Sequence, residues 1–191
     1  MQYYIQTDKS YLGKVDVDID ELLNQCVIEI DGLLDVRPPI MLYGKVVAQT
    51  RNVGFFSDQS IGYYYSRKLA PSKPMTPSLT IMLQLINDKF QTDFNGILIN
   101  EYLNGMDKIC AHSDDEASLS DAGVVCISYG ASRKFRIRNK LTKLIVCDVQ
   151  TNSNEILVMG GDFQKEFTHE IPQEKTIKDR RISFTFRKHL H

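Results

Sequence analysis

The sequence predicts a mainly β fold with flanking helices, of the α+β class. Short β-prone runs alternate with turn residues from position 96 onward, a spacing that favours a sandwich or barrel. The preceding half of the chain instead shows helical spacing of apolar residues in two places. A length of 191 residues fits one domain, and the hydrophobic share of 42% is ordinary for a globular protein. We therefore expect a single domain over residues 1–191.

The N-terminal elements follow in order. Residues 16–28 combine acidic residues in the first turn with apolar residues at helical spacing, which predicts a short helix. The prolines at 38 and 39 end any regular element there, and residues 40–50 and 62–66 have strand composition. Thr76-Pro77 is a typical helix start. The helix that follows has one apolar face: Leu79, Met82, Leu83, Ile86 and Phe90.

The C-terminal half is predicted to form a β-sandwich core. Its β-prone runs are residues 97–102, 123–129, 134–138, 144–149, 156–159 and 182–186. Turn residues separate these runs at intervals typical of packed antiparallel strands. The chain therefore reads as an α/β N-terminal third, one amphipathic helix and a β core.

Charge and cysteine content exclude several classes of protein. The formal net charge of −1 rules out a uniformly basic nucleic-acid coat, although a local basic patch is compatible with it. The four cysteines form no C-x-x-C pair, and we expect buried free thiols in a reducing compartment. No secretory signal and no apolar run of membrane-spanning length is visible. We expect a soluble intracellular protein, cytoplasmic or nuclear according to its source. We also expect it to be a monomer and not to associate with membranes.

A candidate metal site lies after the run at 97–102. His112 and Asp114 are two residues apart, so in a strand or at its exit their side chains point to one face. Of the remaining histidines, two lie in the C-terminal tail, which leaves His169 as the third candidate ligand. Two histidines and one carboxylate on one face are typical of non-haem Fe(II) oxygenases. Taken singly, an H-x-D pair is more often a surface feature, and His169 could be an ordinary half-buried residue.

The strand predicted at 182–186 carries the second informative pattern. Its side chains alternate, with Ile182, Phe184 and Phe186 on one face and Arg181, Ser183, Thr185 and Arg187 on the other. Buried cations cost free energy unless an anion accompanies them, and a guanidinium pairs bidentately with a carboxylate. A dicarboxylate such as 2-oxoglutarate meets that requirement.

Together these motifs resemble the AlkB family of Fe(II)- and 2-oxoglutarate-dependent dioxygenases. The family pattern is N-x-Y, H-x-D, a distant His and R-x-N-x-T-F-R, and here Ser183 replaces the Asn of the last motif. The resemblance spans about residues 40–188 and is closest to the homologues that repair duplex DNA. It implies a double-stranded β-helix, or jelly roll, at about 95–191, with a nucleotide-recognition lid at about 40–75.

The resemblance also implies roles for individual residues. The implied Fe(II) ligands, which are also the catalytic residues, are His112, Asp114 and His169. The implied contacts of 2-oxoglutarate are Arg181 to the distal carboxylate, Arg187 to the keto-acid end, and Asn100, Tyr102 and Ser183. Molecular oxygen is the remaining co-substrate. Because Ser183 is shorter than Asn, that contact would be weaker.

The lid resemblance implies substrate contacts. Tyr43 matches a finger residue that fills the gap left by a flipped base, although an ordinary strand aromatic is an equally good interpretation. Arg51, Tyr63 and Tyr65 match a region that holds the flipped base or its backbone. Glu116 matches an acidic position that favours a cationic base, but it also belongs to the acidic run 114–116, which could simply be solvated.

Residues 132–143 contain six basic residues and no acidic one. The alternation of basic and apolar residues predicts a strand with one cationic face. Such a face favours phosphate contact, whereas a charged edge strand that resists aggregation is the alternative.

The function implied by the resemblance is oxidative demethylation of N-alkylated bases in DNA, such as 1-methyladenine and 3-methylcytosine, with release of formaldehyde, succinate and CO₂. The implied partner is therefore alkylated nucleic acid. One alternative is an oxygenase of the same fold that hydroxylates RNA, a normal DNA base or a protein. A non-catalytic jelly-roll binding module is a second alternative, but it would not need the three metal-ligating residues together.

Overall fold

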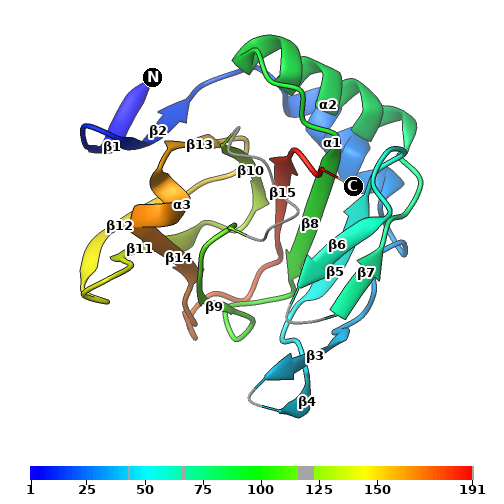
Figure 1. Ribbon diagram of the computed structural model, residues 1–191. Helices are drawn as coiled ribbons and strands as arrows, with labels where there is room; N and C mark the ends of the chain where they lie inside the picture. The colour runs from blue at the N-terminus through cyan, green and yellow to red at the C-terminus, as the bar shows by residue number, and fades with distance from the viewer. Residues whose placement is uncertain (43, 66–67, 116–122, 191) are drawn as a thin grey trace.

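The computed structural model describes residues 1–42, 44–65, 68–115 and 123–190 (Figure 1). Within these residues most strands belong to two antiparallel sheets. The larger sheet has the order β1-β2-β13-β10-β15-β8-β5. Its strands are β1 (Gln2–Gln6), β2 (Ser10–Val15), β5 (Asn52–Phe56), β8 (Gly96–Tyr102), β10 (Val124–Gly130), β13 (Ile156–Gly161) and β15 (Arg181–Arg187).

The smaller sheet has the order β12-β11-β14-β9. Its strands are β9 (Ile109–His112), β11 (Arg133–Asn139), β12 (Ile145–Thr151) and β14 (Phe167–Ile171). Apolar side chains of both sheets form one buried cluster, in which Leu157 and Met159 of the larger sheet join Phe135 and Ile137 of the smaller one. The two sheets therefore pack face to face as the predicted jelly roll.

Two helices cover the outer face of the larger sheet. They are α1 (Asp20–Glu29) and α2 (Pro77–Phe90), and Figure 1 shows both on the side away from β11, β12 and β14. Their buried residues, among them Leu23 and Met82, form a cluster with Ile182, Phe184 and Phe186 of β15. The alternation predicted for β15 is thus confirmed, since its apolar face contributes to this core.

The start of α2 is formed as predicted. Thr76 lies at the N-cap, where its hydroxyl accepts a hydrogen bond from the backbone N–H of Leu79 at 3.4 Å, and Pro77 opens the helix. By contrast, α1 begins at Asp20, four residues later than the segment predicted from position 16. The reason is that β2 extends to Val15, which pairs with Ile156, so the chain must first leave the sheet.

Two hairpins flank the edge of the larger sheet at β5. One is β3 (Pro39–Leu42) with β4 (Lys45–Ala48), and the other is β6 (Gly62–Tyr65) with β7 (Lys68–Pro71). The strand predicted over 40–50 is therefore two strands, which a turn at Gly44 separates at a φ of +77°.

Several short elements were not predicted. They are β1, β2, β5, β7, β9, β14 and the one-turn helix α3 (Phe163–Glu166). The strand β9 has only four residues, and Gly54 interrupts the apolar run of β5, so neither gives a clear sequence signal. Their partners are distant in sequence, and tertiary pairing stabilises them.

Two further expectations concern the cysteines and membrane spans. All four cysteines are free thiols, and Cys26 and Cys126 are buried, but Cys110 is exposed. The expectation of buried thiols is therefore wrong for Cys110, on the short strand β9, and only partly met for Cys147, which is half-buried. Among the described residues, no helix has the length and apolar character to cross a membrane.

Candidate metal and co-substrate site

The three predicted metal ligands meet between the two sheets. His112 ends β9, His169 lies opposite it in β14, and Asp114 follows two residues after β9. The Asp114 carboxylate oxygens lie 3.7 Å from Nε2 of His112 and 3.7 Å from Nε2 of His169. One ligand atom from each residue fits within a span of 4.8 Å. The strand pairing therefore assembles the site that the sequence spacing predicted.

The electrostatic state of this cluster suits a metal ion. Burial lowers the pKa of His169 to about 3 and also lowers the pKa of His112, so both imidazoles are neutral near pH 7. The Nδ1 atom of His112 lies 2.9 Å from the carbonyl oxygen of Cys110, which leaves Nε2 to face Asp114. Burial alone would raise the pKa of Asp114, but the guanidinium of Arg187 and the two imidazoles lower it. Two neutral imidazoles and one carboxylate are a donor set that fits Fe(II).

Arg187 contacts this cluster directly. Its Nη2 atom lies 2.7 Å from Oδ1 of Asp114, and its guanidinium lies over the ring of Tyr63 at 5.2 Å from the centroid. Both side chains of the ion pair are almost completely buried. The guanidinium therefore fixes the orientation of the carboxylate, a contact that the sequence did not predict.

Arg181 is a buried cation with unused donors. It is 1% exposed, and its Nη2 donates a hydrogen bond to the hydroxyl of Ser128 at 2.9 Å. Its Nε and Nη1 atoms have no hydrogen-bond partner among the described residues. Burying such donors costs free energy unless an anion accepts from them. The site therefore fits a carboxylate of 2-oxoglutarate.

The remaining predicted co-substrate residues line the same small cavity, of about 40 Å³. Asn100 and Tyr102 come from β8 and Ser183 from β15, where Ser183 pairs with Asn100 across the sheet. The side-chain oxygen of Asn100 accepts a hydrogen bond from Nε of Arg51 at 2.7 Å. Arg51 therefore joins the lid region to the floor of the site.

Comparison with known proteins identifies the family. A family model described as the 2OG-Fe(II) oxygenase superfamily matches residues 17–187. The chain belongs to this superfamily. It is an Fe(II)- and 2-oxoglutarate-dependent dioxygenase that uses O₂, and among the described residues the side chains of His112, Asp114 and His169 form a group that could hold a metal ion.

The relatives are of the AlkB type. The oxygenase is 26% identical over 186 residues to the DNA oxidative demethylase ALKBH2 of Homo sapiens, covering 93% of this chain and 70% of that protein. For ALKBH2 of Bos taurus the identity is 27%, covering 93% of this chain and 66% of the relative. It is also 31% identical over 135 residues to the alpha-ketoglutarate-dependent dioxygenase alkB homolog 3 of Rattus norvegicus, covering 65% of this chain and 46% of the relative. These matches bear out the AlkB-family resemblance.

A solved structure shares the fold. The structure of OsALKBH1 superposes with a TM-score of 0.64 at 15% identity, and the match covers 98% of this chain and 100% of that one. This agreement supports the jelly-roll assignment for the oxygenase.

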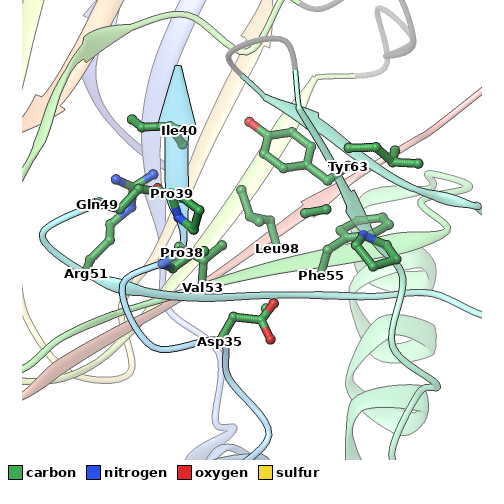
Figure 2. Close-up of a pocket in the computed structure, with 14 residues that line it drawn as sticks. Asp35, Pro38, Pro39, Ile40, Gln49, Arg51, Val53, Phe55, Tyr63 and Leu98 are labelled. Carbon is green, nitrogen blue, oxygen red and sulfur yellow. The ribbon is translucent and has the colours of Figure 1, made fainter. Parts of the chain in front are cut away.

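A second, larger cavity adjoins the metal site. It measures about 250 Å³ and lies between the β3–β4 and β6–β7 hairpins, as Figure 2 shows. Arg51, Tyr63 and Leu98 line both cavities, so the two are neighbours. Its other walls are mainly apolar, with contributions from Ile40, Val53, Phe55, Leu69, Pro38, Pro39 and Pro71. An apolar chamber with a few polar groups is the usual form of a small-molecule site.

The structure describes some of the predicted lid residues but not all of them. Arg51 and Tyr63 are buried and line both cavities. The backbone of Tyr65 pairs with Lys68 in the β6–β7 hairpin. Tyr43 and Glu116 lie outside the described residues, so their predicted roles stay predictions.

The basic segment 132–143 differs from the expectation of an open cationic face. Arg136 pairs with Asp148 at 2.8 Å, and Arg138 pairs with Glu170 at 2.8 Å. Arg133 is fully buried and donates to backbone carbonyls, among them that of Pro172 at 2.7 Å. Acidic residues of the neighbouring strands therefore neutralise much of the positive charge on this surface. The sequence did not show this, because these partners are distant along the chain and meet the basic residues only through strand pairing. The predicted phosphate contact stays a prediction.

Sequence reasoning missed one histidine. His189 was assigned to the tail, but it is 2% exposed, and its ring centroid lies 4.5 Å from that of Phe55. Its backbone is held by Asn95, whose side-chain oxygen accepts from the His189 N–H at 2.7 Å. Burial, with a contribution from Arg187, lowers its pKa to about 4. No local sequence signal could have shown this packing.

Proposed function

We propose that this dioxygenase removes N-methyl groups from nucleobases in DNA, with 1-methyladenine and 3-methylcytosine as substrates and formaldehyde, succinate and CO₂ as products. The observation that carries the proposal is the ring-sized chamber beside the metal site, with Arg51 and Tyr63 in its wall. An enzyme that acts on a base must take it out of the helix into such a chamber. The ALKBH2 relatives are DNA oxidative demethylases, which supports the same conclusion.

The proposed roles in the metal site follow the geometry. His112, Asp114 and His169 hold Fe(II), which with 2-oxoglutarate and O₂ supplies the oxidation of the methyl group. Arg181 offers its two unused donors to the distal carboxylate of 2-oxoglutarate. Arg187 holds the keto-acid end and keeps the Asp114 carboxylate oriented through their 2.7 Å contact. Asn100, Tyr102 and Ser183 complete the co-substrate cavity.

The proposed role of the lid is to orient the methylated ring and exclude water. Tyr63 presents a buried aromatic surface, and Arg51 is held by Asn100 so that its position is fixed before substrate arrives. We further propose that Tyr65 contacts the flipped nucleotide, that Glu116 favours a cationic base, and that Tyr43 fills the gap in the helix. The last two residues lie outside the described part of the chain.

The test is formaldehyde release. The protein is reconstituted anaerobically with Fe(II), then given O₂ and 2-oxoglutarate with duplex or single-stranded oligonucleotides that carry one 1-methyladenine or 3-methylcytosine. We expect formaldehyde and succinate in equal amounts from methylated DNA and none from the unmodified oligonucleotide. His112→Ala is the matched inactive control, because it removes one ligand of the triad.

Two results would contradict the proposal. Equal turnover of 2-oxoglutarate with and without methylated DNA, and no formaldehyde, would keep the dioxygenase and assign its substrate elsewhere. Release from methylated RNA with none from either form of DNA would move the activity to the alternative oxygenase of the same fold.

A further inference from the structure

Gln49 presents an unsatisfied polar atom in the wall of the larger cavity. The residue follows β4 and is only 8% exposed. Its backbone N–H donates to the carbonyl oxygen of Pro38 at 3.1 Å, which fixes the main chain. Its side-chain carbonyl oxygen, however, has no hydrogen-bond partner among the described residues. A buried acceptor without a donor costs free energy, so its retention calls for an explanation.

The surroundings of Gln49 point to a ligand rather than to a protein partner. Figure 2 shows Gln49 beside Arg51 on one wall of the cavity, with Ile40 and Pro39 near them. Arg51 is a donor only, whereas the carbonyl of Gln49 is an acceptor. A ring that enters this cavity thus meets a donor and an acceptor side by side, with apolar surface around them.

Asp35 is the other acidic or amide side chain in this lining. It is less suited than Gln49 to accept a hydrogen bond from a ring in the cavity. Its carboxylate pairs with Lys73 at 2.9 Å, and half of its side chain is exposed to solvent. A carboxylate that is exposed to solvent and already paired gains little from one further hydrogen-bond donor. Between these two side chains, Gln49 is therefore the buried acceptor that this cavity offers to a ring.

We infer that Gln49 is a specificity-determining residue, whose carbonyl oxygen accepts a hydrogen bond from the exocyclic amino group of the methylated ring. This inference rests on the proposed demethylase function and deepens it. It selects bases with an amino group beside the methylated nitrogen, namely 1-methyladenine and 3-methylcytosine. Rings that carry a carbonyl at that position place two acceptors against each other and are disfavoured.

The experiment compares matched bases in otherwise identical oligonucleotides. The rings of 3-methylcytosine and 3-methyluracil differ in the group at one carbon, amino in the first and carbonyl in the second, and the first is also a cation when protonated. Because this charge difference is the same for every protein tested, the change in selectivity between wild type and Gln49→Leu isolates the hydrogen bond. The measured quantity is the ratio of their kcat/KM values for formaldehyde release. The purine pair 1-methyladenine and 1-methylhypoxanthine repeats the comparison on the larger ring.

Two variants separate hydrogen bonding from shape. Gln49→Leu has similar size and no polar atom, and we expect it to lower the amino-to-carbonyl selectivity by roughly 10- to 100-fold, as loss of one buried hydrogen bond does. Gln49→Glu keeps the acceptor, and we expect it to retain most of the selectivity. Thermal unfolding of each variant verifies that the protein remains folded.

Several outcomes would overturn the inference. An equal fall in kcat/KM for both members of a pair would show that Gln49 only shapes the cavity. A selective loss on the carbonyl-bearing rings would show that the amide donates instead of accepting. If the wild-type protein releases formaldehyde from none of the four bases, the proposed function itself fails, and that result is seen before any variant is made.

Discussion

The two faces of β15 have opposite chemistry. On the outer face, Ile182, Phe184 and Phe186 are at most 1% exposed and pack in the core cluster beneath α1 and α2. On the inner face, Arg181 and Arg187 are almost equally buried, at 1% and 3% exposure, but they line the cavity that holds the candidate metal triad. Equal burial on the two faces therefore has different consequences: the outer side chains form a core, whereas the inner ones face the candidate site.

The difference shows how one strand serves both purposes. Apolar side chains gain free energy when they leave water, at about 25 cal/mol per Å² of apolar surface. Buried guanidinium groups lose their hydration, and only ionic or hydrogen-bonding partners compensate for that loss of free energy. Arg187 has such a partner in Asp114, whereas Arg181 keeps two donors unused. Substitutions on the outer face should consequently affect unfolding, and substitutions on the inner face should affect ligand binding.

The largest effect is expected from Phe184→Ala on the outer face. The side chain is fully buried, so its truncation leaves a cavity and should lower the free energy of unfolding by about 3–5 kcal/mol. Urea unfolding measures this loss. The folded fraction should keep the wild-type requirement for 2-oxoglutarate. Phe184→Leu serves as the milder control, and a destabilisation below that of the control would show that the outer face contributes little to stability.

A smaller effect of the opposite kind is expected from Arg181→Ala. The free energy of unfolding should change little or increase, because a buried cation with unused donors is removed. The concentration of 2-oxoglutarate needed for half-maximal turnover should rise on the order of 100-fold, since a buried charge-assisted contact is lost. Titration of succinate formation against 2-oxoglutarate tests this. An unchanged requirement, with Arg181→Lys also unchanged, would remove the proposed role.

The two faces also explain how much could be predicted from the sequence. The alternation of β15 and the two-residue spacing of His112 and Asp114 follow from the period of a β-strand, so the fold class and the metal triad were accessible. His169 was found by elimination, and strand pairing then placed it opposite His112. The first two features depend on local periodicity, which a single sequence records, whereas the elimination that left His169 also set aside the buried His189.

Features that depend on contacts between distant segments could not be predicted. The acidic partners of the basic strand β11 lie on β12 and β14, so pairs such as Arg138 with Glu170 were invisible. The second cavity forms where two hairpins meet β5, and Gln49 has no motif around it. His189 follows the last strand and resembles a tail residue until Phe55 and Asn95 cover it.

The smallest expected effect concerns His189, which lies at the edge of the two regions. Its pKa is lowered from 6.5 to about 4, so the unfolded chain binds a proton more readily than the folded protein. The stability contributed by the neutral ring is complete above pH 6.5 and is lost as pH falls toward 4. At pH 5 the loss relative to pH 8 should be on the order of 2 kcal/mol.

His189→Leu isolates this contribution, because all other titrating groups remain in both proteins. Urea unfolding at pH 8 and pH 5 should show a smaller acid destabilisation in the variant than in the wild-type protein. The buried ring contacts Phe55 and the edge of Tyr63, and the guanidinium of Arg187 lies over the Tyr63 ring, so protonation of His189 would add a second positive charge close to that guanidinium. An identical pH response in the two proteins would mean that His189 binds a proton as readily in the folded protein as in the unfolded chain. In that case the buried environment of the inner face would end at Arg187 and would not include the ring of His189.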